Sequence, residues 1–214
     1  MADLDEAETA LASEDWRWFA VRLPAGERSR LYPCLAGETW FLDIETTGLS
    51  PFKSEITTVA LYDGARCRVL VHGRDIEETP VLLDQKTLLV TFNGKAFDLR
   101  FLRHRLGWKG GDLHLDLWHE FRARGMSGGL KKIERRLGMA KRTSAVQNGM
   151  EAIKLWYQYL AGDGQALRRL VAYNEEDARV LKSLVLYLIE QSMVAYPMGE
   201  SLVRRAIARN TPRT

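Results

Sequence analysis

Two acidic residues alternate with apolar ones in the segment FLDIETTGL, residues 41–49. In an extended strand successive side chains point to opposite faces, so Asp43 and Glu45 share one face. Two neighbouring carboxylates repel each other unless a positive charge neutralises them. A divalent cation with a preference for oxygen ligands would supply that charge. The alternative is a strand end at which both acids face water.

Two further acids could join this pair. Asp98 follows the apolar segment TLLVTF and lies in the first turn of a predicted helix, where the helix dipole favours negative charge. Asp177 lies inside another predicted helix, in the segment YNEED, with Tyr173 one turn before it on the same face. The simpler alternatives are helix-terminus stabilisation for Asp98 and a solvent-exposed helix acid for Asp177.

The segments DIETTGL, FNGKAFD and YNEED resemble, in this order, the three exonuclease motifs of the DEDD superfamily, which has the ribonuclease H-like fold. The layout of residues 38–190, including HLDLWHEF and LWYQYLAGD, is most similar to the bacterial YprB-like branch of that fold. The resemblance implies that two Mg²⁺ or Mn²⁺ ions are bound by four acids: Asp43, Glu45, Asp98 and Asp177.

The resemblance also implies roles for uncharged residues. Tyr173 stands four residues before Asp177, as in the tyrosine subclass, whereas the position used by the histidine subclass holds Ala172. Thr46 and Leu49 match positions that contact the terminal nucleotide in relatives. Asn93 matches the Asn of the second motif, and for this residue holding the strand-to-helix turn is an equal alternative.

The activity implied by the resemblance is that of a metal-dependent 3′–5′ exonuclease. Two cations about 3.5–4 Å apart can activate a water and stabilise both the attacking and the leaving oxygen of a phosphodiester. Hydrolysis would release nucleoside 5′-monophosphates. With an ordinary pKa of about 10, Tyr173 suits the orientation of water better than general-base catalysis.

Two alternatives to this activity remain open. One is a catalytically idle ribonuclease H-like module that only binds nucleic acid or a protein. The other is a structure-selective endonuclease that uses the same metal site. The expected partner is nucleic acid with a single-stranded 3′ end, and neither DNA nor RNA is favoured. Protein partners stay unknown from the sequence, and no membrane contact is expected.

The elements that must position these residues predict an α/β fold. Five strands are expected, at residues 39–45, 55–62, 65–72, 87–92 and 112–117. Helices are expected at residues 95–106, 117–124, 128–137, 153–160 and 165–193. An antiparallel meander followed by helix-linked strands predicts a ribonuclease H-like, mixed five-stranded sheet flanked by helices.

Length and composition limit the other possibilities. The chain has 214 residues, of which 46% are hydrophobic and 28% charged, as in a soluble globular protein. No run approaches the roughly 18 apolar residues of a membrane span. Cys34 and Cys67 are too few for a disulfide framework, so we expect a cytoplasmic protein. The expected parts are an acidic helix and irregular lead-in (1–37), the exonuclease domain (38–195) and a basic tail (196–214).

Positive charge is concentrated in residues 99–142. This segment has twelve Lys and Arg against four acids, a net charge of +8, and since the chain carries +3 the remainder carries −5. A face that binds a polyanion needs such a concentration, and Lys131 and Lys132 would then bind phosphates outside the metal site. Solvated helix faces are the alternative. Within the segment, Asp116 ends a predicted strand, where it supports the metal ligands or forms a structural salt bridge.

Overall fold

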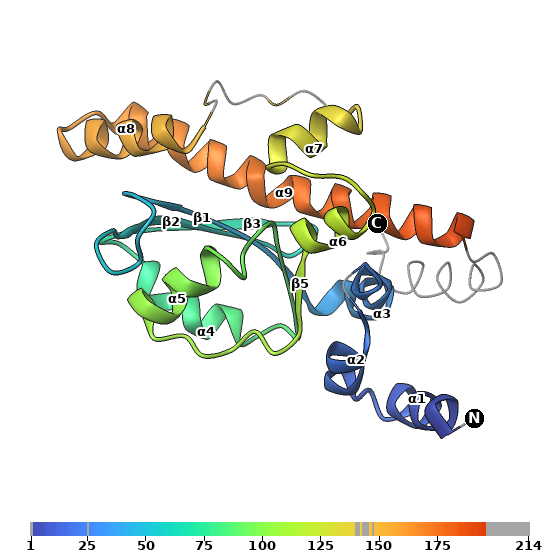
Figure 1. Cartoon of the computed structure of the whole chain (residues 1–214). Helices are drawn as coiled ribbons and strands as arrows, with labels where there is room; N and C mark the ends of the chain where they lie inside the picture. The colour runs from blue at the N-terminus through green and yellow to red at the C-terminus, as the bar shows by residue number, and fades with distance from the viewer. Residues whose placement is uncertain (1, 25, 140–141, 143–145, 147, 196–214) are drawn as a thin grey trace.

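The structure is a computed structural model that describes residues 2–24, 26–139, 142, 146 and 148–195. A five-stranded sheet has the order β3-β2-β1-β4-β5 (Figure 1), so β1 is central. Its strands are β1 (Thr39–Thr46), β2 (Ile56–Tyr62), β3 (Cys67–Val71), β4 (Leu88–Thr91) and β5 (His114–Asp116). Strands β1, β2 and β3 are antiparallel neighbours, whereas β4 is parallel to both β1 and β5. The predicted mixed sheet is confirmed.

Helices cover both faces of the sheet (Figure 1). One face carries α9 (Gly164–Ala195), which α8 (Gly149–Leu160) precedes and over which α7 (Leu130–Arg136) lies. The other face carries α4 (Thr79–Leu83), preceded by the 3₁₀ turn η3 (Ile76–Glu78), and α5 (Asp98–Leu106). Helix α6 (Leu117–Ala123) directly follows β5. No helix in the described part of the chain is long and apolar enough to cross a bilayer.

The expected irregular lead-in is instead largely helical. After α1 (Ala2–Ala12) come α2 (Trp16–Arg22), η1 (Arg28–Leu31), α3 (Tyr32–Leu35) and η2 (Ala36–Glu38). Pro33 lies in the first turn of α3, where a missing N–H costs nothing. Leu31 and Leu35 are buried in the same core cluster as residues of β1 and α9. The predicted basic tail, 196–214, lies outside the described residues.

The alternation of β1 divides the core into two layers. Phe41 is buried in one cluster with Leu184 and other residues of α9. Leu42 and Ile44 are buried in a second cluster with Phe101 and other residues of α5. Because side chains alternate along a strand, the acidic residues of β1 share a face with Phe41 and point toward α9.

The carboxyl-terminal half of β1 is paired on one edge only. Its parallel pairing with β4 covers Thr39 to Phe41, whereas its antiparallel pairing with β2 continues to Thr46. The backbone of β1 beyond Phe41 is therefore open on the side where the β4–α5 turn lies. This opening allows the start of α5 to approach the acidic part of β1.

Two leucines of α9 test this packing. Leu184 is fully buried, whereas Leu186 is 39% exposed. Leu184→Ala should lower the free energy of unfolding by about 3 kcal/mol, because it leaves a cavity between α9 and the sheet. Leu186→Ala should lower it by less than about 1 kcal/mol. Urea denaturation followed by circular dichroism measures both losses, and equal values would contradict the packing described here.

Candidate active site

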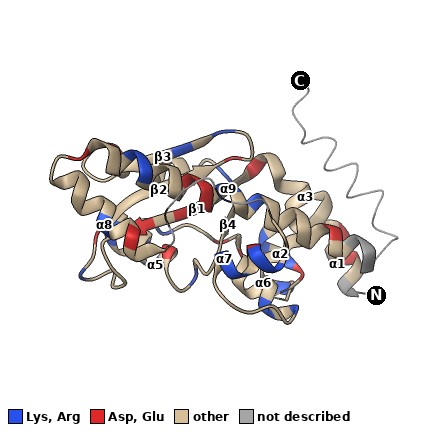
Figure 2. Ribbon diagram, turned by 90° about the horizontal axis from the view of Figure 1, so that it is seen from above, with Lys and Arg blue, Asp and Glu red and all other residues tan. Residues whose placement is uncertain are grey.

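Three acidic side chains from two elements meet over the central strand. Asp43 and Glu45 of β1 and Asp177 of α9 each offer a carboxylate oxygen, and these oxygens lie within 4.8 Å of one another. Glu45 and Asp177 are buried, and Asp43 is partly buried. Figure 2 shows the acidic parts of β1 and α9 near the middle of the molecule. Oxygen ligands at this separation suit a hard divalent cation.

A buried amide fixes the orientation of Asp43. The Nδ2 of Asn174 donates a hydrogen bond to the Oδ2 of Asp43 at 2.7 Å, and Asn174 is fully buried. Asn174 lies three residues before Asp177, so both side chains project from the same face of α9. Asn174 was not among the site residues predicted from the sequence. Its spacing from Asp177 within YNEED is the signal that could have found it.

Asp98 approaches the same part of β1 from the other face of the sheet. It is the first residue of α5, and it is buried. The backbone N–H groups of Asp98 itself and of Ile44, the residue between the two acids of β1, act to lower the pKa of this carboxyl group. Asp98 is not one of the three acids within 4.8 Å, yet its charge raises the pKa of both Asp43 and Glu45.

Asp116 supports the turn that leads to Asp98. Its carboxylate accepts hydrogen bonds from three backbone N–H groups: those of Asn93 at 2.7 Å, Lys95 at 3.0 Å and Trp118 at 3.1 Å. Asn93 has a left-handed backbone with φ of 64°, a conformation that Asn adopts more readily than most residues. Asp116 therefore stabilises the turn between β4 and α5, which includes the backbone of Asn93. A substrate contact by the Asn93 side chain stays a prediction.

The other residues expected to contact the substrate lie around the end of β1. The Oγ1 of Thr46 donates a hydrogen bond to the carbonyl of Gly48 at 2.7 Å, within the loop that follows the strand. Leu49 is 86% exposed in the same loop. A large apolar side chain with this exposure is free to contact a base, and both roles stay predictions.

Tyr173 is buried one turn before Asp177 and donates a hydrogen bond to its carboxylate. Burial, together with the charges of Asp177, Glu45 and Asp43, raises the pKa of the Tyr173 phenol well above its ordinary value. The hydroxyl is therefore protonated at neutral pH. It can donate a hydrogen bond, and it cannot serve as a general base.

The charges of the acidic cluster are incompletely balanced. Burial, and then repulsion by neighbouring carboxylates, raises the pKa of Asp43 and of Glu45 well above the usual range. Burial also raises the pKa of Asp177, although Arg142, Tyr173 and Lys131 oppose the shift. For Asp98, burial raises the pKa to about 7. Buried oxygen donors that hold protons this tightly fit a site for divalent cations.

The basic segment 99–142 does not form a single face. Helix α5 lies on one side of the sheet, whereas α6 and α7 lie on the other, where Figure 2 shows clustered Lys and Arg. Lys131 and Lys132, which were predicted to bind phosphates outside the metal site, lie in different environments, and their phosphate contacts stay a prediction. The Nζ of Lys131 lies 4.4 Å from the centre of the Tyr173 ring, whereas Lys132 is exposed. Successive residues of a helix point about 100° apart, so only one of them faces the site.

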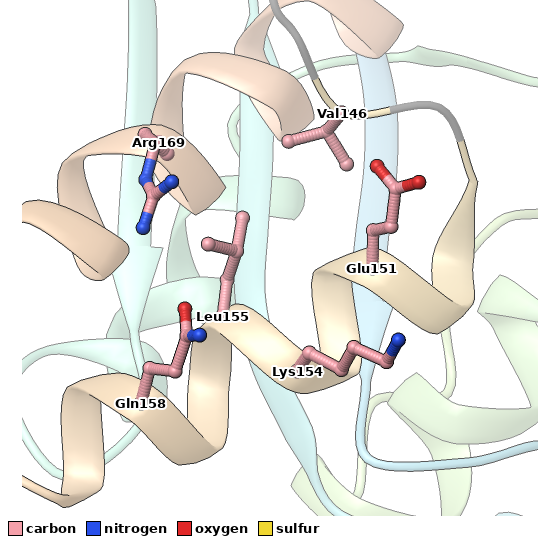
Figure 3. Close-up of a pocket in the computed structure, with 6 residues that line it drawn as sticks. All are labelled: Val146, Glu151, Lys154, Leu155, Gln158 and Arg169. Atoms are coloured by element: carbon pink, nitrogen blue, oxygen red, sulfur yellow. The ribbon is translucent and has the colours of Figure 1, made fainter.

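A pocket of about 220 Å³ includes none of the residues of the acidic cluster. Side chains of α8 and α9 and the nearby Val146 line it (Figure 3): Val146, Glu151, Lys154, Leu155, Gln158 and Arg169. Val146 connects the pocket to the site, since its carbonyl accepts a hydrogen bond from the Nζ of Lys131 at 3.1 Å. It also shares a core cluster with Tyr173.

The model of the RNase H superfamily matches residues 40–189 of the chain. No curated protein sequence matches this chain. Its fold is similar to that of NrnC from Brucella melitensis, with a TM-score of 0.51, 18% identity and coverage of 81% of this chain and 83% of NrnC. For NrnC with bound Mg²⁺ the TM-score is 0.52, with 19% identity and coverage of 84% and 86%.

A family B DNA polymerase from Pyrobaculum calidifontis is also similar, with a TM-score of 0.54 and 19% identity over 71% of this chain. The chain spans only 24% of that polymerase. At these identities the likeness shows the fold alone, which is ribonuclease H-like.

The raised carboxyl pKa values predict how stability depends on pH. These groups bind protons more tightly in the folded chain than in the unfolded chain, so the metal-free protein should become less stable as the pH rises through about 7, the pKa of Asp98. The loss should reach about 1.4 kcal/mol per pH unit for each such group. A bound cation would replace the protons, so Mg²⁺ should raise the Tm more at high pH than at low pH.

Calorimetry in EDTA and in Mg²⁺ across the neutral pH range measures this dependence. The variant Asp98→Asn is the control, because it should show a shallower fall in stability near pH 7. A Tm in EDTA that does not change across this range would contradict the prediction.

Proposed function

The chain belongs to the RNase H superfamily, and from that premise we propose that it is a metal-dependent 3′–5′ exonuclease of the DEDD type. Its substrate would be nucleic acid with a single-stranded 3′ end, and its products nucleoside 5′-monophosphates. The observation that carries the proposal is the convergence of Asp43, Glu45 and Asp177 within 4.8 Å, with Asp98 against the same strand.

The donor set supports binding of Mg²⁺ or Mn²⁺. Asp43, Glu45 and Asp177 would hold one ion, and Asp98, with Asp43 shared, a second. The structurally similar NrnC binds Mg²⁺. Two divalent cations at such a site would supply an activated water and stabilise the attacking and leaving oxygens of the phosphodiester.

The remaining residues of the site would fix these ligands and the reactants. Asn174 orients Asp43 through its amide, and Asp116 holds the turn that delivers Asp98. The protonated hydroxyl of Tyr173 is placed to orient a reactant, which supports assignment to the tyrosine subclass. Leu49, exposed at the end of β1, would pack against the terminal base, beside the loop that Thr46 stabilises.

Replacement of Asp43 by Asn tests the activity. Wild-type protein should degrade an oligonucleotide labelled at its 5′ end to a ladder in Mg²⁺ or Mn²⁺. Asp43→Asn should lower the rate by at least about 10³-fold, because it removes a shared ligand worth several kcal/mol of transition-state stabilisation. Glu190→Gln, which changes an exposed acid further along α9, is the control and should leave the rate unchanged.

Other product patterns would contradict the exonuclease. A single internal cut would indicate the endonuclease, and binding without any hydrolysis would indicate the idle module. Near wild-type turnover by Asp43→Asn would remove the acidic cluster from the reaction.

Tyr173→Phe should reduce the rate without abolishing it. Loss of an orienting hydroxyl should lower kcat by about 10- to 100-fold, because the reactants are held less well aligned. The pH profile of kcat should keep its shape, since the hydroxyl carries no proton in the reaction. Tyr157→Phe, at a tyrosine of α8 that is 56% exposed, is the control. Full activity of Tyr173→Phe would exclude the residue from the mechanism, and a loss equal to that of Asp43→Asn would make it a proton carrier.

A further inference from the structure

The Arg142 guanidinium reaches the acidic cluster from outside the two elements that carry its acids. Its Nη1 donates to the Oδ1 of Asp177, one of the three clustered carboxylates. Its Nε and Nη2 donate to the two oxygens of Glu134, at 3.1 and 2.5 Å. Arg142 therefore lies between two carboxylates, of which only one belongs to the cluster.

Glu134 holds the guanidinium in a fixed direction. A carboxylate that takes two parallel hydrogen bonds from one side of a guanidinium fixes its plane as well as its position. The Glu134 side chain is 8% exposed and lies on α7, one turn after Lys131, so both project toward the site. A buried acid whose two oxygens both hold one arginine aims the remaining nitrogen, Nη1, at the cluster.

The Arg142 guanidinium also has N–H groups that do not bond to Asp177 or Glu134. Arginine has five N–H groups, and three of those of Arg142 bond to carboxylates among the described residues. Two donors therefore remain, and the side chain is 17% exposed, so an incoming ligand can reach it. Because a guanidinium stays charged at any working pH, the ligand that suits these donors is an anion with paired oxygens.

We propose that Arg142 is a substrate-binding residue of this site, which contacts a phosphate oxygen at the scissile bond, and that Glu134 is the residue that positions it. The inference rests on the proposed nuclease function. When the oxygens of Asp177 are engaged by a cation, Arg142 keeps Glu134 but gains a positive neighbour, and the donor that bonded to Asp177 becomes free for another anion. The phosphodiester is the anion that the proposed reaction brings to this place, and its oxygens match the guanidinium donors.

The test compares Arg142→Gln with Arg136→Gln, which removes an exposed arginine at the end of α7. Three quantities are measured for each variant. They are kcat/KM on a 5′-labelled single-stranded oligonucleotide, the salt dependence of binding to the same oligonucleotide with a phosphorothioate at its 3′ end, and Mg²⁺ affinity from Tm shifts without nucleic acid.

Arg142→Gln should lower kcat/KM by about 10²-fold or more, as expected for loss of a donor to the reacting phosphate. It should reduce the slope of log affinity against log salt by about 1, because one phosphate contact is lost. Mg²⁺ affinity should be unchanged or higher, since Asp177 loses a competing partner. Arg136→Gln should change none of the three, and Glu134→Gln should lower kcat while keeping the salt slope.

Arg142→Gln leaves Glu134 buried without its partner, so the variant could fail to fold for that reason alone. The double variant Glu134→Gln/Arg142→Gln removes both charges and keeps a polar pair of similar size. It should fold and show the same loss of kcat/KM and salt slope. Arg142→Lys should recover the salt slope but little of the turnover, because a lysine cannot reproduce the fork of donors.

Several results would overturn the inference. Turnover and salt slope equal to those of Arg136→Gln would exclude a phosphate contact while leaving the nuclease intact. Parallel losses of Mg²⁺ affinity and turnover would mean that Arg142 only supports Asp177. Tighter Mg²⁺ binding with full turnover would mean that Arg142 only neutralises Asp177 until the cation binds. A wild-type protein without hydrolysis would refute the proposed function instead, and the salt slope would still decide whether Arg142 binds phosphate.

Discussion

Repulsion among buried carboxylates is the constraint around which this fold is arranged. Water screens like charges well, but a protein interior does not, so each acid placed next to another needs a compensating contact. The contacts come from α9, from Arg142 and from backbone N–H groups. Asp43 receives an amide from α9, Asp98 receives backbone N–H groups, and Asp177 receives a tyrosine hydroxyl and a guanidinium. The repulsion that these contacts do not compensate raises the pKa values of the carboxyl groups.

The sheet topology explains why the acids meet at this place. Strands β1, β4 and β5 run parallel, so their carboxyl ends lie at the same edge of the sheet. Each of these ends supplies an acid: Glu45 is the last residue but one of β1, with Asp43 before it, Asp98 follows β4, and Asp116 ends β5. In open α/β sheets this edge is where ligands bind. The short pairing between β1 and β4 keeps the edge open, and α9 closes it from one face with Asp177.

Features set by local periodicity could be predicted from the sequence, and those set by distant contacts could not. Strand alternation places Asp43 and Glu45 on one face, and apolar spacing predicts the helices and the mixed sheet. The helices of the lead-in are short and lack a long apolar periodicity, and one of them contains Pro33, which a helix accepts in its first turn. Glu134 and Arg142 were missed because in sequence they look like part of a solvated charged segment. Only the tertiary structure shows that they pair with each other and reach α9.

The positive charge that compensates the carboxylates is unevenly distributed, with more on the α7 side of the cluster than on the β1 side. On the α7 side, Arg142 and Lys131 oppose the rise in the pKa of Asp177 and of Glu45. On the β1 side, the hydrogen-bond partner of Asp43 among the described residues is a neutral amide, which orients the carboxylate without balancing its charge. The demand for an external cation is therefore greatest at Asp43, between the other acids. The positive side chains of Arg142 and Lys131 lie on the opposite, α7 side of the cluster. An anionic substrate bound there would balance their charge.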